Sequence, residues 1–409
     1  MDPNPLGSKA QAGTTLRLDA RAQPLEFIAI GHATLDKTTD GFRAGGSALY
    51  AARTAHALGL SSALVTATGV DLPPSAFAGL GGLVALGRQS TRFDNLYQDG
   101  RRSQTVLARA EEIPASLIER LQREQPIAPD AVTLYCPVAD ELSERVPLAA
   151  LSPHGLCGVS PQGFMRRWDE TGAVQNVPWR VDDFRLRTVD IVAFSDEDLD
   201  GDETWARELP IPTITITRGA DGADILYERR AAHVRALVVD EVDPTGAGDV
   251  YMATLLIAMR AGRPPIEAAR LACCAASLAV EGPFLGKLAD AHALEERYRR
   301  YRIEVLGETS PDAEAFDRLD FESFCDAVES WFYRLKGRQG QFTPRDFRLV
   351  RHWYDAGWDL PSIERGIDNA FRERSAGRSR DSEEVNTLGY CEPFIREIVE
   401  GPTPRQRRR

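Results

Sequence analysis

Short apolar runs alternate with helical patterns over about residues 25–302, and this alternation limits what the chain can fold into. Runs typical of buried strands occur at residues 27–30, 63–67, 132–135, 191–194 and 211–217. Residues 47–58 have the spacing of a helix between the first two runs. Chains of this kind usually place parallel strands beside one another and helices on the faces of the sheet. The sequence therefore predicts an α/β fold with a mainly parallel sheet.

Residues 92–110 interrupt this alternation. Two stretches, 93–97 and 102–107, flank the dipeptide Asp99-Gly100. Asp-Gly between two strand-like runs is a strong signal for a β-hairpin. A hairpin inserted in an α/β core is expected to form a small β lid, and it is also a candidate surface for a homodimer.

The composition becomes polar near Pro311, and only helical patterns follow. Thr343 precedes Pro344 and Asp346, an order typical of a helix start. We therefore expect a disordered lead-in over 1–24, an α/β domain over 25–305, a linker over 306–315, an all-α accessory module over 316–400 and a basic tail over 401–409.

The net charge of −12 falls entirely before residue 316, because the rest of the chain carries 17 basic and 17 acidic residues. This distribution argues against general affinity for nucleic acids.

The six cysteines form no C-x-x-C pair, which favours reduced thiols. No apolar run is long enough to span a bilayer, and the first 24 residues lack the apolar core of a signal peptide. We expect a cytoplasmic protein without a membrane partner.

A glycine-rich turn leads directly into an apolar helix at residues 243–249 (DPTGAGD). The backbone N–H groups and the dipole at the start of a helix attract negative charge, and glycine lets an anion approach the backbone closely. Asp249, in the first turn, could accept a proton from a hydroxyl group beside such an anion. A solvated acid that only stabilises the helix dipole would fit equally well, and the motif alone leaves both interpretations open.

Residues 243–249 resemble the C-terminal signature of the ribokinase-like (PfkB) carbohydrate kinases, whose core is D-T-x-G-A-G-D. The resemblance implies that Asp249 is a general base and that the amides of Gly246, Ala247 and Gly248 form an anion hole. It also implies that Thr245 binds the cofactor.

Other segments resemble landmarks of the same family, in the same order. Gly45 and Gly46 resemble its double-glycine motif, and Asp36 stands where the family often has an acid that binds substrate hydroxyls. Residues 217–222 (TRGADG) resemble its nucleotide loop, which implies cofactor binding by Thr217, Arg218, Gly219 and Gly222. The likeness covers about residues 25–302 and implies a three-layer sandwich with a small β lid.

Two positions depart from the family's pattern. Tyr50 stands five residues after the first glycine of the double-glycine motif, where the family usually has an asparagine that binds sugar hydroxyls. The resemblance implies that Tyr50 binds substrate, and its aromatic ring argues against ribose-like acceptors. The N-x-x-E motif that helps to organise Mg²⁺ and phosphate appears as residues 195–198 (SDED). The resemblance implies that Ser195 lies at the cofactor and that Asp198 is a Mg²⁺ ligand.

The predicted hairpin resembles that of a divergent, inositol-kinase-like branch of the family. This narrower resemblance implies that Tyr97, Arg102 and Gln104 bind substrate.

The expected function is transfer of the γ-phosphoryl group of ATP, with Mg²⁺, to a hydroxyl group of a small sugar, polyol or nucleoside. The alternative is a non-catalytic ligand-binding or regulatory protein on the same fold, with the C-terminal helices as an interaction module. Tyr50 and the altered acidic segment favour the alternative, whereas Asp249 and the intact glycine-rich turn oppose it. The C-terminal helical segment carries no motif that assigns it to a family.

Overall fold

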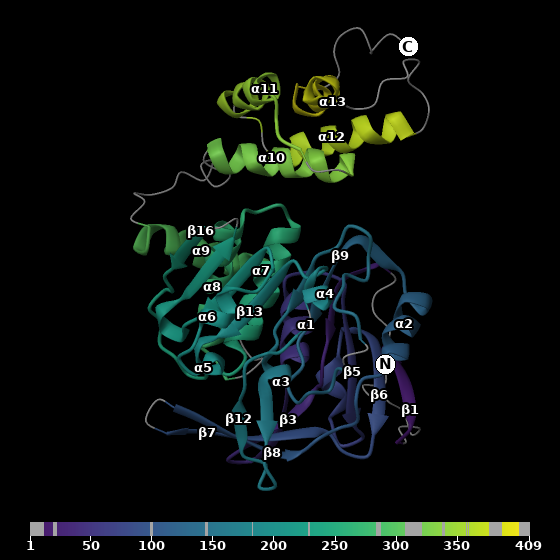
Figure 1. Cartoon of the computed structure of the whole chain (residues 1–409), viewed down its shortest axis with the longest axis vertical. Helices are drawn as coiled ribbons and strands as arrows, with labels where there is room; N and C mark the ends of the chain where they lie inside the picture. Colours follow the sequence, from purple (N-terminus) through teal and green to yellow (C-terminus); the bar gives the residue numbers. More distant parts are fainter. Residues whose placement is uncertain are drawn as a thin grey trace. The chain divides into compact units, whose positions relative to one another are not determined.

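The computed structural model describes residues 12–18, 23–98, 101–143, 146–181, 183–227, 230–283, 288–306, 321–337, 340–356, 358, 360–375 and 387–400. The chain divides into two compact units, residues 1–308 and 309–409. All described strands belong to the first unit, and the described part of the second unit is helical (Figure 1).

Ten strands of the N-terminal unit form one sheet in the described residues. In spatial order they are β1 (Thr14–Leu18), β6 (Gly81–Gly87), β5 (Ser62–Gly69), β2 (Leu25–Ile30), β9 (Ile127–Tyr135), β10 (Cys157–Val159), β13 (Ile191–Ser195), β14 (Thr213–Thr217), β15 (Ala223–Tyr227) and β16 (Arg230–Val234). The strands from β6 to β14 pair in parallel, and β1, β15 and β16 pair antiparallel at the two ends. The predicted mainly parallel sheet is confirmed.

Helices cover both faces of this sheet, which confirms the α/β fold (Figure 1). One face packs against α1 (Ser47–Ala57), α7 (Ala247–Arg260) and α8 (Pro265–Ala279), and α9 (Ala291–Glu304) packs on α8. Side chains of the other face share a core with α2 (Ala115–Glu124), α3 (Gln162–Met165), α4 (Asp183–Leu186), α5 (Asp196–Leu199) and α6 (Thr204–Arg207). The central strands are apolar throughout because both of their faces are buried, and all eight residues of β5 are buried.

A second sheet of four strands confirms the predicted β lid. Its order is β4 (Gly41–Gly45), β3 (Thr34–Thr38), β7 (Thr91–Gln98) and β8 (Arg101–Ala108). The predicted hairpin is β7 and β8, and its turn at 99–100 lies outside the described residues. A short two-stranded sheet, β11 (Arg166–Trp168) and β12 (Val174–Asn176), lies beside the lid (Figure 1).

The predicted disordered lead-in over 1–24 was wrong for one stretch. Thr14–Leu18 form β1, which pairs antiparallel with β6 at the edge of the large sheet. The apolar side chains of Leu16 and Leu18 alternate with polar ones, as in an edge strand with one solvent-facing side. The polar, proline-containing and glycine-containing sequence before them concealed this short pattern.

The C-terminal unit contains four described helices, α10 (Phe321–Lys336), α11 (Pro344–Asp355), α12 (Leu360–Ser375) and α13 (Leu388–Glu400). They share their own core, in which Val328, Trp353, Ile363 and Ile367 are completely buried. The predicted start of α11 is confirmed, because Thr343 and Asp346 form a reciprocal capping box. Within the described residues, no helix of either unit combines the length and the apolar character needed to cross a membrane.

Candidate active site

A cavity of about 340 Å³ opens at the carboxyl ends of three neighbouring parallel strands. Ser160 directly follows β10, Ser195 ends β13 and Thr217 ends β14, and all three line the cavity. The segment 244–249 at the start of α7 forms a further part of its wall. Ligands of open α/β sheets bind at this edge, beyond the carboxyl ends of the strands.

The glycine-rich turn has the shape that an anion site requires. Gly246 is the N-cap of α7, with φ +84°, a conformation that other residues adopt only under strain. A Cβ added at Gly248 would meet no atom within 4 Å, so the backbone there borders open space. One expectation needs correction: the N–H of Ala247 donates to the carbonyl of Pro244 at 3.1 Å. Ala247 therefore closes the turn, and the predicted anion hole then rests on the amides of Gly246 and Gly248, which both line the cavity.

Asp249 lies in the first turn of α7 and lines the cavity beside these amides. The helix dipole favours a carboxylate at this position. Thr245 also lines the cavity, and its N–H donates to Asp243 Oδ1 at 2.9 Å, which fixes the entry to the turn. The structure thus brings Asp249, Gly246, Ala247, Gly248 and Thr245 together at one cavity wall.

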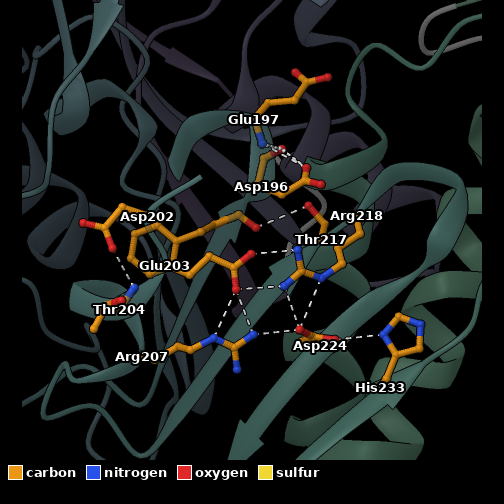
Figure 2. A network of polar contacts seen from close by, with 12 residues as sticks. Asp196, Glu197, Asp202, Glu203, Thr204, Arg207, Thr217, Arg218, Asp224 and His233 are labelled. Atoms are coloured by element: carbon orange, nitrogen blue, oxygen red, sulfur yellow. Dashed lines mark hydrogen bonds and ion pairs between the residues drawn. The ribbon is translucent and has the colours of Figure 1, made fainter. Parts of the chain in front are cut away.

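Residues 217–222, here called the 217–222 loop, join β14 to β15 as the end of a hairpin. The N–H of Arg218 donates to the carbonyl of Gly222 at 2.8 Å, which closes the loop. Thr217, Gly219 and Gly222 line the cavity, as expected for cofactor-binding residues. Arg218 differs from them, because its guanidinium bonds to Glu203 and Asp224 instead (Figure 2).

Ser195 is the N-cap of α5, and its hydroxyl accepts a hydrogen bond from the N–H of Glu197 at 3.3 Å. The side chains of Asp196, Glu197 and Asp198 follow it along the cavity wall. None of the described residues that line the cavity is a lysine, arginine or histidine. No group of three or more His, Cys, Asp or Glu side chains in the described residues is placed to hold a metal ion.

An apolar wall completes the cavity. Its members are the small and branched side chains that follow β16 or lie on α8: Ala236, Leu237, Val238, Val239, Cys273, Ala276 and Val280. Val238 is 90% exposed, so one apolar side chain stands at the rim. The wall unites two segments that lie about 40 residues apart in the chain, and only the packed structure reveals their proximity.

Tyr50 reaches the glycine-rich turn from α1. A Cβ built on Gly246 would stand 2.6 Å from the Tyr50 ring, so the ring lies directly on this glycine. The phenolic oxygen is buried and has no hydrogen-bond partner. Burial, followed by the nearby charges of Asp36 and Asp249, raises the pKa of Tyr50 far above its usual value, so the phenol remains a neutral donor.

The other predicted substrate residues at this end are packed closely. A Cβ on Gly45 would lie 2.3 Å from Asp36 Oδ2, and one on Gly46 would lie 2.4 Å from the carbonyl of His32. Gly46, with φ +100°, accepts the N–H of Tyr50 at 3.0 Å. Tyr50 therefore contacts the turn, and none of Asp36, Gly45, Gly46 and Tyr50 is among the described residues that line the cavity.

Of the predicted substrate residues of the hairpin, only Gln104 has a described side chain. The side chains of Tyr97 and Arg102 lie outside the described part of the structure. Gln104, on β8, donates from Nε2 to Asn95 Oδ1 at 2.7 Å and does not line the cavity.

Gln162 is a cavity residue that sequence reasoning missed. Its Oε1 accepts a hydrogen bond from Arg166 Nη2 at 2.6 Å, and its Nε2 donates to Ser47 Oγ at the start of α1. Arg166 is buried and also donates to the carbonyl of Val138 at 3.1 Å. Gln162 therefore presents an oriented carboxamide near α1. This is the helix on which Tyr50 stands in place of the family's usual asparagine. Its helix, α3, is a single turn after a three-residue strand, too short to give a sequence signal.

Residues 197–286, which include the 217–222 loop and the glycine-rich turn, match the pfkB family carbohydrate kinases. Among curated proteins, the Bifunctional protein HldE of Caulobacter sp. (strain K31) is 42% identical over 66 residues. This stretch is 16% of the present chain and 14% of that protein.

Solved structures of the ribokinase family resemble the N-terminal unit. A pyrophosphate-dependent kinase in this family, complexed with a pyrophosphate analog and myo-inositol, matches with a TM-score of 0.56 and 18% identity, over 66% of this chain and 99% of that chain. Arabidopsis thaliana ribokinase, complexed with ribose and ATP, matches with a TM-score of 0.52 and 16% identity, over 68% of this chain and 99% of that chain.

At these identities the structural likeness concerns the fold. It agrees with the segment match, and the resemblance first noted in the motifs is confirmed. The N-terminal unit has the fold of the ribokinase family, and its residues 197–286 match the model of the pfkB family carbohydrate kinases.

Proposed function

We propose that this protein is a kinase that transfers the γ-phosphoryl group of ATP to a hydroxyl group of a small polyol, sugar or nucleoside. The observation that carries the proposal is the shared cavity. One wall holds Asp249 beside the first-turn amides of α7, another is the 217–222 loop, and a third is apolar. Such a cavity offers a base, a place for an anion and a place for a flat apolar group.

In this mechanism Asp249 accepts the proton of the acceptor hydroxyl while the acceptor oxygen attacks the γ-phosphorus in line. The bond from phosphorus to the β–γ bridging oxygen breaks, and ADP leaves with that oxygen. The amides of Gly246 and Gly248 stabilise the charge on the equatorial oxygens of the transferred group. The proton then passes from Asp249 to solvent.

The apolar wall supports a nucleoside triphosphate as the donor. Leu237, Val239, Ala276 and Val280 offer an apolar surface of the kind that packs against a nucleobase. Pyrophosphate has no group that would occupy such a wall, and basic side chains would be its natural partners. The described lining residues include no such basic side chain. ATP is therefore the preferred donor, although a ribokinase-family relative of similar fold is named as pyrophosphate-dependent.

The acidic lining supports a requirement for Mg²⁺. A polyphosphate that enters beside Asp196, Glu197 and Asp198 meets carboxylates. Mg²⁺ is typically held by one or two carboxylates together with substrate phosphates and water, and it needs no dedicated protein cage. Asp198 would contribute to holding it, and the ion would supply neutralisation of the phosphate charge.

The acceptor is expected at the end of the cavity that adjoins α1. Gln162 offers an oriented carboxamide there, and the ring of Tyr50 packs on Gly246 at the neighbouring turn. Hydrogen-bonding groups of this kind suit a molecule with several hydroxyl groups, such as a polyol.

A screen of donors and acceptors tests the proposal. The purified full-length protein is incubated with Mg²⁺ and either ATP or pyrophosphate, together with myo-inositol, D-ribose, D-fructose or adenosine, and phosphorylated product is detected by mass spectrometry. We expect product with ATP for at least one acceptor, and its loss on addition of EDTA. Binding of ATP without any product would favour the non-catalytic alternative. Product with pyrophosphate alone would contradict the choice of donor.

A further inference from the structure

Five polar side chains next to the 217–222 loop are joined by hydrogen bonds and ion pairs (Figure 2). They are Glu203, Arg207, Arg218, Asp224 and His233. None of the five is among the described residues that line the cavity. A member of the network could therefore affect the cavity only through the backbone that it holds.

Arg218 is the central cation of this network. Its Nη1 and Nη2 contact Oε1 and Oε2 of Glu203 at 2.7 and 2.8 Å, which is a two-pronged pair. Its Nε and Nη2 also donate to Asp224 Oδ2 at 3.2 and 2.8 Å. Burial opposes the ionisation of Asp224, but bonds from Arg218, His233 and Arg207 outweigh it and lower its pKa to about 2.

Arg207 duplicates some of these contacts. It donates from Nε and Nη2 to Glu203 Oε2 at 3.1 and 2.8 Å, and from Nη2 to Asp224 Oδ2 at 2.8 Å. His233 pairs with the other oxygen of Asp224 at 2.8 Å. Without Arg207, each of the four carboxylate oxygens would still contact Arg218 or His233. Without Arg218, the contact to Glu203 Oε1 would be lost.

The two arginines also differ in where their backbones lie. Arg218 stands between Thr217 and Gly219, which both line the cavity, whereas Arg207 ends α6 outside it. The far end of the loop is held at Gly222, where an added Cβ would stand 2.0 Å from the carbonyl of Val234. Gly219, by contrast, has open space around it. Arg218 therefore anchors the start of the loop, next to Gly219, where few atoms pack against the backbone.

We propose that Arg218 is a positioning residue for the phosphoryl donor, which holds the 217–222 loop in place through Glu203 and Asp224. The inference rests on the proposed function, because the loop is taken to contact ATP. Glu203 lies just after α5, whose Asp196 and Asp198 line the facing part of the cavity. The Arg218–Glu203 pair thus links the two segments between which the donor phosphates would lie.

Steady-state kinetics of Arg218→Ala, Arg218→Lys and Arg207→Ala test this role. We expect Arg218→Ala to raise the KM for ATP about 10- to 100-fold with kcat changed less than about threefold, because a displaced loop weakens donor binding. Arg218→Lys should recover only part of the loss, since an ammonium cannot form the two-pronged pair. Arg207→Ala is the matched control, and its KM for ATP should stay within about threefold of the original.

Amide hydrogen exchange of the peptide spanning 217–227, without nucleotide, gives a second readout that does not depend on kinase activity. Exchange in this peptide should be faster in Arg218→Ala than in the unchanged protein, whereas Arg207→Ala should resemble the unchanged protein. Equal exchange in both variants, or equal KM values for ATP, would overturn the inference. If the protein proves not to use ATP, the proposed function falls, and the exchange result alone decides whether Arg218 positions the loop.

Discussion

The ring of Tyr50 lies on Gly246, so close that a Cβ at Gly246 would stand 2.6 Å from ring carbons Cδ1 and Cε1. The contact joins α1 to the N-cap of α7, where Gly246 already has a φ of +84°. Position 246 therefore requires glycine for two independent reasons. Any substitution of Tyr50 alters the surface against which the proposed anion site is built.

Tyr50→Phe should stabilise the ligand-free protein by about 0.5–1 kcal/mol, because it removes a buried hydroxyl that has no hydrogen-bond partner. Chemical denaturation measures the free energy of unfolding. Tyr251→Phe is the matched control: the Tyr251 hydroxyl is also buried but bonds to Thr215 Oγ1 at 2.9 Å, so its loss should destabilise the protein. Destabilisation by both variants to the same extent would contradict the prediction.

A change of side chain at Tyr50 should also alter acceptor choice. Tyr50→Asn restores a carboxamide and leaves space beside Gly246, so the ranking of myo-inositol, D-ribose and adenosine as acceptors should change while the Kd for ATP stays nearly constant. Relative kcat/KM values for the three acceptors measure this. An unchanged ranking would mean that Tyr50 serves packing only.

Glu364 should make the stability of the C-terminal unit depend on pH. Burial, reinforced by the charge of Asp368 and opposed by Arg334, raises the pKa of Glu364 to about 7. The folded state then holds the proton more tightly than the unfolded state, so stability is fully present below about pH 4.5 and is lost as the pH rises through 7. Replacement by a neutral side chain should remove this loss.

Glu364→Gln should therefore raise the free energy of unfolding by about 2–3 kcal/mol relative to the unchanged protein at pH 8, and by little at pH 5. Thermal unfolding of the full chain at both pH values measures the difference. Glu392→Gln, which removes a carboxylate paired with Arg396 on α13, controls for the loss of one charge. The same gain at both pH values would show that Glu364 does not titrate in this range.

The C-terminal helices should be dispensable for phosphoryl transfer. Each unit has its own core, and every described residue that lines the cavity falls between Ser160 and Val280. A protein that ends after residue 307 should therefore keep ATP binding and most of its turnover, as measured by calorimetry and product formation. A truncated protein that is folded but inactive would mean that the helices complete or gate the site.

Features that depend on neighbouring residues in the chain could be predicted from the sequence. The turn at 243–249, the capping box of Thr343 and Asp346 and the β7–β8 hairpin are all local, and all appear in the structure. Helix α13 lies within the predicted all-α module, although it contains Pro393 in its interior, a residue that usually ends a helix.

Features that depend on tertiary packing could not be predicted. The direction of the Arg218 side chain follows from Glu203, 15 residues earlier, and the nucleotide-loop motif gives no indication of it. The same holds for Gln162, which is oriented by Arg166 and Ser47, the latter 115 residues away. The sequence could locate the loop and the turn, whereas the assignment of side chains to the cavity required the structure.

The most direct measurement is phosphoryl transfer by Asp249→Asn. The amide is nearly the same size as the carboxylate, so the fold and the Kd for ATP should change little, while the rate should fall by roughly 10²- to 10⁴-fold. Asp290→Asn, at the N-cap of α9 and outside the cavity, is the matched control, because asparagine caps a helix as well as aspartate does. Single-turnover transfer from γ-labelled ATP, with the acceptor that the unchanged protein uses, measures the rate. A large loss in Asp249→Asn alone is the predicted result, and comparable rates in Asp249→Asn and the unchanged protein would contradict the role of Asp249 as the base.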